Sequence, residues 1–172
     1  MIRLLNLDDA EKYRELRIKC LTDSPLSWLS TKEDELKLPQ STYVSKIINS
    51  VAPPIFGTYG YFLKGTLVAY AQLASNYWSK KSHIINLFDF CVDKNVRHQR
   101  IGTKLVTYLI EKAKSANFVE QIQLRVNSEN IGAIAFYEKS GFKKIATLPK
   151  SVKELNGSYQ GEYIYSLFLK NI

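Results

Sequence analysis

The sequence predicts an α/β domain over residues 1–172, in which strands and helices alternate along the chain in a mixed order. Apolar and polar residues alternate strictly over residues 120–126, as in a half-buried strand. Residues 84–92 form an apolar, β-rich run that is typical of a buried strand. After that run, apolar residues recur about every four positions from Leu105 to Ala113, which indicates an amphipathic helix. The chain has no internal repeat or linker, so we expect one domain.

The other elements are predicted from shorter signals. The N-terminal half is expected to hold a strand over residues 2–6, a helix capped by Asp8 or Asp9 and ended by Ser24-Pro25, a short helix from Thr31 to before Pro39, and a helix over residues 40–49. Later expected elements are two strands over residues 57–73 with a turn at Lys64-Gly65, a polar loop over 76–82, a helix end with Asn117 as a left-handed cap, a helix over 131–140, and strands over 142–148 and 159–169 joined by a long polar loop.

Composition is that of an ordinary soluble globular protein, with 45% hydrophobic and 23% charged residues. No apolar run approaches the roughly 20 residues of a membrane span, and the N-terminus lacks the apolar region of a signal peptide. Two cysteines, Cys20 and Cys91, form neither a disulfide framework nor a metal quartet. We therefore expect a cytoplasmic protein in which both are buried free thiols.

The formal net charge of +8 would attract either nucleic acid or a polyanionic cofactor. The lysines are scattered, and neither a zinc-ligand spacing nor a recognition-helix pattern is present. The sequence therefore does not favour nucleic-acid binding, and most of the charge is interpreted as solvated surface.

A basic loop joins the strand of residues 84–92 to the amphipathic helix. The first amides of a helix have no partner within it, and the helix dipole places positive charge at that end. Arg97, Arg100 and Lys104 add charge beside these amides, so the junction is a candidate phosphate or pyrophosphate site. The alternative is a surface loop that is basic only because the whole protein is basic. Neither a Walker A pattern nor the dinucleotide fingerprint is present.

Two motifs carry a resemblance to a known family. The first is Arg97-His-Gln-Arg100-Ile-Gly102, and the second is Asn130-x-x-Ala133-x-x-x-Tyr137-x-x-x-Gly141-Phe142. From about residue 84 to 148 the chain resembles the GCN5-related N-acetyltransferases. The resemblance implies a mixed, mostly antiparallel sheet of six to seven strands flanked by about four to five helices. It also implies acetyl-CoA-dependent transfer of an acetyl group to a primary amine, directly and within a ternary complex.

The resemblance implies a cofactor site for acetyl-CoA and requires no metal. The cofactor-binding residues would be Phe90, Cys91, Val92, Arg97, His98, Gln99, Arg100, Ile101, Gly102, Thr103, Asn130, Ala133, Phe136 and Tyr137. Backbone groups of residues 90–92 would pair with pantetheine, and an amide near Cys91 or Val92 would polarise the thioester carbonyl. Arg100 stands where the family usually has its first glycine. Its side chain would either hinder the approach of the pyrophosphate or add a charge-assisted donor.

Tyr137 and Asp89 are the candidate catalytic residues. The resemblance implies that Tyr137 is the general acid near the coenzyme A sulfur, whereas its position beside Phe136 would also suit core packing. A phenol of pKa near 10 protonates a thiolate of pKa about 8.5 at a cost of about 2 kcal/mol, so a hydrogen bond would serve as well. Asp89 is an acid in apolar company and a candidate base; pairing with an arginine is the alternative.

Other functions and partners stay open at this point. A non-catalytic acyl-CoA-binding sensor or partner module is the alternative to an enzyme. An acyl-cysteine on Cys91 is not favoured, because no activating base is visible nearby. Residues 28–38, Trp78 and residues 150–160 would wall the acceptor site, and Glu33, Asp34 and Glu35 would either attract a cationic amine or serve the helix dipole. The acceptor could be a small molecule or a protein, and the resemblance leaves a homodimer open.

Overall fold

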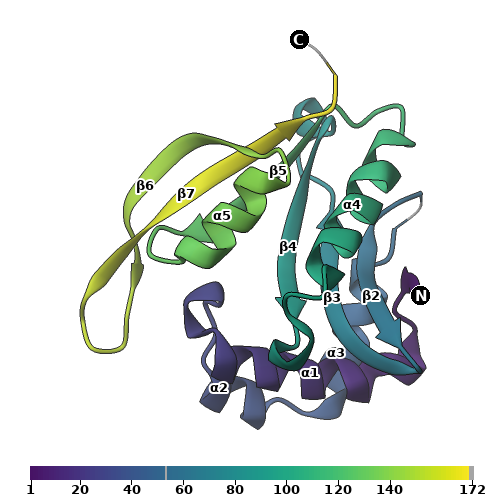
Figure 1. Cartoon of the computed structure of the whole chain (residues 1–172), viewed down its shortest axis with the longest axis vertical. Helices are drawn as coiled ribbons and strands as arrows, with labels where there is room; N and C mark the ends of the chain where they lie inside the picture. Colours follow the sequence, from purple (N-terminus) through teal and green to yellow (C-terminus); the bar gives the residue numbers. More distant parts are fainter. Residues whose placement is uncertain (53, 171–172) are drawn as a thin grey trace.

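A seven-stranded sheet runs through the computed structural model, which describes residues 1–52 and 54–170 (Figure 1). The strands are β1 (Ile2–Leu4), β2 (Gly57–Leu63), β3 (Thr66–Ala74), β4 (Ile84–Val92), β5 (Gln121–Asn127), β6 (Lys143–Lys153) and β7 (Tyr159–Phe168). Their order is β1-β2-β3-β4-β5-β7-β6. Only β4 and β5 are parallel neighbours, so the predicted mixed, mostly antiparallel sheet is confirmed.

Helices cover this sheet on both faces. They are α1 (Ala10–Asp23), α2 (Lys32–Lys37), α3 (Gln40–Ser50), α4 (Ile101–Lys114) and α5 (Ile131–Lys139), with a 3-10 turn η2 (Pro25–Ser27) after α1. The side chain of Thr31 accepts the N–H of Asp34 and begins α2, as expected of a cap. Within the described residues, no helix has the length and apolar character needed to cross a membrane.

The two faces of β3 belong to two apolar clusters. Ala69, Ala71 and Leu73 lie in the cluster that includes the buried stripe of α4. Tyr70 points to the other face, where it joins residues of α1 and α3, among them Tyr13. This alternation is the period-2 pattern of a strand that is covered on both sides.

The parallel pair β4–β5 separates part of the way along the two strands. Pairing between them is limited to residues 84–86 of β4 and 121–123 of β5. Beyond that point β4 stays paired only with β3, and β5 only with β7 (Figure 1). The second half of β4 therefore has backbone groups on one side that no strand uses.

Two local predictions are wrong. β6 extends to Lys153, so only residues 154–158 remain of the predicted long loop. A register shift between Leu148 and Val152 interrupts the alternation there and hides the strand from a periodicity argument. α4 ends at Lys114 with a cap at Ser115, and Asn117 does not adopt the expected left-handed conformation.

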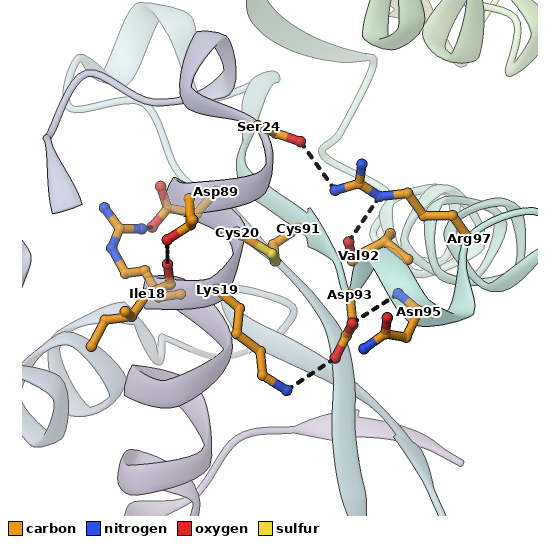
Figure 2. Close-up of a disulfide and its surroundings, with 12 residues drawn as sticks. Ile18, Lys19, Cys20, Ser24, Asp89, Cys91, Val92, Asp93, Asn95 and Arg97 are labelled. Atoms are coloured by element: carbon orange, nitrogen blue, oxygen red, sulfur yellow. Dashed lines mark hydrogen bonds and ion pairs between the residues drawn. A yellow bond between two sulfur atoms is a disulfide. The ribbon is translucent and has the colours of Figure 1, made fainter.

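The cysteines also differ from expectation. Cys20 of α1 and Cys91 of β4 form a disulfide, with their Cα atoms 6.3 Å apart (Figure 2). Both residues are buried, and neither is a free thiol. The prediction failed because 71 residues separate the two positions, which meet only when α1 packs against β4.

Candidate functional site

A cavity of about 1270 Å³ lies where β4 and β5 diverge. Pockets of about 300–1,000 Å³ hold most small ligands, so this one has room for a large cofactor together with a second molecule. Its walls come from β4, the first turn of α4, α5, η2 and the facing parts of β5 and β7.

The first turn of α4 forms one end of the cavity. Ile101, Gly102 and Thr103 line it, and Arg100 is the residue that precedes the helix. Arg100 has φ 60° and ψ 16°, the left-handed conformation that glycine adopts most easily. The backbone thus follows the path that a glycine would allow, and the amides of the turn stay accessible to an anion.

Arg97 ties the basic loop to its surroundings. Its Nε donates to the carbonyl of Val92 at 3.2 Å, and one terminal nitrogen donates to Ser24 Oγ at 3.0 Å (Figure 2). Close packing holds the loop from the other side, since a Cβ at Gly102 would lie 3.4 Å from Val92 and 3.5 Å from the Phe136 ring. These contacts fix the loop between β4 and α5.

Asn130 begins α5 and crosses the mouth of the cavity. Its Oδ1 accepts the N–H of Ala133 at 3.2 Å, which caps the helix. Its Nδ2 donates to Ser27 Oγ at 2.9 Å, so α5 is joined to η2. Asn130, the first residue of the second family-like motif, therefore caps α5 and joins it to η2.

Tyr137 lies deep in the cavity wall with 9% of its surface exposed. The rings of Phe90, Phe136 and Phe142 surround it, with centroids 6.2, 5.3 and 5.9 Å away. Burial among these rings raises the pKa of the Tyr137 hydroxyl, so the phenol stays protonated at neutral pH. Among the described residues the hydroxyl has no hydrogen-bond partner, which leaves it able to donate to a ligand.

Asp89 also lines the cavity and lies at a β-bulge of β4. Asp89 and Phe90 together face the single residue Ala71 of β3, and Asp89 has φ 51°. The extra residue turns Asp89 toward α1, where its Oδ2 accepts from Arg17 Nη1 at 3.1 Å and from the Tyr13 hydroxyl at 3.4 Å. The structure therefore shows the Asp89 carboxylate paired with an arginine, which was the alternative to a free base.

Most of the predicted site residues meet at this cavity. The lining residues among them are Asp89, Phe90, Val92, Arg97, His98, Arg100, Ile101, Gly102, Thr103, Asn130, Ala133, Phe136 and Tyr137. Gln99 and Cys91 are not lining residues, and the sulfur of Cys91 is bonded to Cys20. An acyl-cysteine at Cys91 would require the free thiolate that this bond removes.

Arg17 lines the cavity beside Asp89, and sequence reasoning missed it. It lies 72 residues before Asp89, and no local pattern distinguishes it from the other basic residues of α1. In the part of the chain that the structure describes, no group of three His, Cys, Asp or Glu residues could hold a metal ion.

Fold and site together define a class of protein: a mixed α/β sheet whose diverging parallel strands enclose a basic helix start and a buried tyrosine. A model of the acetyltransferase (GNAT) family matches residues 13–142. The chain belongs to this family, and the resemblance noted in the sequence is confirmed.

Individual relatives are more distant. The L-amino acid N-acetyltransferase AaaT of Escherichia coli (strain K12) is 28% identical over 101 residues, which is 59% of this chain and 61% of that protein. The chain spans 39% to 61% of the length of the curated relatives it matches.

Two solved structures share the fold. A ribosomal-protein-alanine N-acetyltransferase from Brucella melitensis has a TM-score of 0.84 at 19% identity, over 98% of this chain and 99% of that one. The putative acetyltransferase yncA from Salmonella typhimurium, solved with acetyl-CoA, has a TM-score of 0.77 at 15% identity, over 100% and 95% of the two chains.

Proposed function

We propose that the protein is an N-acetyltransferase that moves an acetyl group from acetyl-CoA to a primary amine, directly and within a ternary complex. The main support is that one cavity reaches the first turn of α4, the Tyr137 hydroxyl and the Asp89 carboxylate. An anion site, a proton donor and a proton acceptor would thus serve a single reaction.

Acetyl-CoA would lie between β4 and α5. The amides of residues 101–103 and the guanidinium of Arg100 would hold the diphosphate. The unpaired edge of β4 at residues 90–92 would bind pantetheine through backbone hydrogen bonds. The similar fold of yncA, which was solved with acetyl-CoA, supports this assignment.

The chemical step forms a C–N bond and breaks the C–S bond of the thioester. An ammonium must first lose a proton, which at pH 7 costs about 4–5 kcal/mol for a lysine-like amine of pKa about 10.4 and about 1 kcal/mol for an N-terminal α-amine of pKa about 7.7–8.0. Asp89 would accept that proton, directly or through water, because its carboxylate lines the cavity and one of its oxygens has no donor among the described residues. The amine then attacks the carbonyl, and an amide near Val92 would stabilise the oxyanion.

Tyr137 would stabilise the departing coenzyme A thiolate. With an ordinary phenol, full proton transfer already costs about 2 kcal/mol, and the raised pKa of Tyr137 makes transfer costlier. The hydroxyl would therefore act chiefly as a hydrogen-bond donor to the sulfur, and the thiolate would take, through water, the second proton that the attacking nitrogen loses as the amide forms.

The acceptor we propose is an α-amine. AaaT is named for L-amino acids, and the Brucella melitensis neighbour for an alanine of ribosomal protein. Both names describe an amino group on the carbon that bears a carbonyl or carboxylate group. The test panel should therefore contain free amino acids, peptides with an N-terminal alanine, and polyamines as the contrasting class.

Calorimetry with acetyl-CoA and thiol release with this amine panel test the proposal. We expect saturable acetyl-CoA binding and acetylated product with at least one α-amine, confirmed by mass spectrometry. Binding without product from any amine would instead identify a non-catalytic acyl-CoA-binding module. No binding at millimolar acetyl-CoA would refute both functions.

A further inference from the structure

Arg17 is a buried cation that lines the cavity together with three of its contacts, Trp28, Ser30 and Asp89. Only 8% of its side chain is exposed. Its Nη1 donates to Asp89 Oδ2 at 3.1 Å, and its Nη2 donates to Ser30 Oγ at 3.3 Å. Its guanidinium carbon lies 4.7 Å from the centre of the Trp28 ring. One side chain therefore connects β4 to the segment after η2.

Glu35 holds Arg17 in this position. Arg17 Nε donates to Glu35 Oε1 at 2.7 Å, and the Tyr43 hydroxyl donates to Oε2 at 2.6 Å. Burial would raise the pKa of Glu35, but the hydrogen bonds from Tyr43 and Arg17 outweigh it and lower the pKa to about 2. Glu35 is therefore ionised at neutral pH, and its charge keeps the guanidinium beside Asp89. A carboxylate that served only the helix dipole would be exposed, so that interpretation does not describe Glu35.

Asp89 is consequently bound on one oxygen and free on the other. Its Oδ2 accepts from Arg17 and from Tyr13, whereas no described residue donates to its Oδ1. The side chain is 30% exposed and lines the cavity. The bulge that presents it uses a left-handed, non-glycine residue, a conformation that persists only when its surroundings hold it.

We propose that Arg17, held by Glu35, is the positioning residue that presents Asp89 Oδ1 to the acceptor amine. By occupying Oδ2, the guanidinium leaves Oδ1 as the oxygen to which no described residue donates. Asp89 touches the acceptor, whereas Arg17 and Glu35 act through Asp89. This inference rests on the proposed acetyl transfer, and it assigns recognition of the cationic amine to a buried network that spans α1, α2 and β4.

The decisive variant replaces the buried pair together, Arg17→Met with Glu35→Met. Removing one partner alone would leave a buried charge without its nearest partner, whereas apolar replacement of both is commonly tolerated. Lys19→Met is the matched control, because Lys19 also reaches from α1 to an acid, Asp93, at 3.5 Å just after β4, but is 59% exposed (Figure 2). Arg17→Lys keeps the charge but loses the two-pronged donor.

We expect the double variant to lower kcat/KM for the amine at least tenfold, mainly through KM, while KM for acetyl-CoA changes less than twofold. Arg17→Lys should recover part of this loss, and Lys19→Met should match the wild type. A general loss of packing would change both KM values together. A folded double variant with wild-type kinetics for the amine would overturn the proposal.

A crystal structure of the double variant provides a readout that does not need turnover. We expect the Asp89 carboxylate to leave the position beside Tyr13. An Asp89 side chain that keeps its place without Arg17 would overturn the positioning role. If the wild type acetylates no amine, the proposed function fails, and the crystal structure alone then decides whether Arg17 positions Asp89.

Discussion

Reduction of the Cys20–Cys91 disulfide should weaken the fold without abolishing it. The bond closes a loop of 71 residues, from α1 to the end of β4. In the chain-entropy model, a cross-link over a loop of this length removes about 4 kcal/mol of conformational freedom from the unfolded chain. The free energy of unfolding of a small domain is about 5–15 kcal/mol, so the disulfide would contribute a large part of it.

Urea unfolding followed by circular dichroism, with and without reductant, measures the difference. We expect a lower midpoint in reductant, and a double variant, Cys20→Ala with Cys91→Ala, that unfolds at the same urea concentration under both conditions. Thiol counting on the oxidised, denatured protein must find no free thiol. Two free thiols there would refute the pairing, and equal midpoints for the oxidised and reduced wild type would refute the magnitude.

Three further predictions concern single side chains. Tyr137→Phe should lower kcat about 100-fold and leave the acetyl-CoA dissociation constant within twofold, measured by thiol release and calorimetry; an unchanged kcat would remove Tyr137 from the chemistry. Arg100→Gly should raise the free energy of unfolding by about 0.5–1 kcal/mol, because glycine adopts the left-handed conformation of this position without strain. The same variant should weaken acetyl-CoA binding about tenfold, because it removes the guanidinium. Tighter binding would mean that the Arg100 side chain obstructs the diphosphate. The pKa of Glu35 is lowered to about 2 in the folded protein. At pH values above its pKa in the unfolded chain, the ionised carboxylate therefore stabilises the fold by about 3 kcal/mol. This stabilisation is lost as the pH falls from about 5 to 2. The stability gap between wild type and Glu35→Gln in urea unfolding should shrink over that interval, and a gap independent of pH would contradict the assignment.

Short-range patterns predict most of the elements correctly. The strand of residues 84–92 agrees with the structure, and the short helix predicted from Thr31 begins one residue later, at Lys32; each depends on residues within one or two turns of the chain. The prediction fails at β6, where a bulge breaks the alternation. The cytoplasmic location stays a prediction, and a disulfide is not what a reducing compartment would favour.

The cofactor end of the site can be predicted from the sequence, because its parts are contiguous in the chain. The loop from Arg97 to Gly102 lies between one strand and one helix, and the pattern from Asn130 to Tyr137 lies on a single helix face. The structure adds that Arg100 takes the backbone conformation of the glycine it replaces.

The acceptor end depended on tertiary packing. Arg17 meets Glu35 across 18 residues and Asp89 across 72, and these contacts exist only because α1 packs against α2 and against the bulge of β4. Hydrophobic periodicity states which face of a helix is buried, but not which strand it meets or at what register. A carboxylate and a guanidinium that are so far apart in the chain carry no sign of each other in the sequence, and the fold alone pairs them.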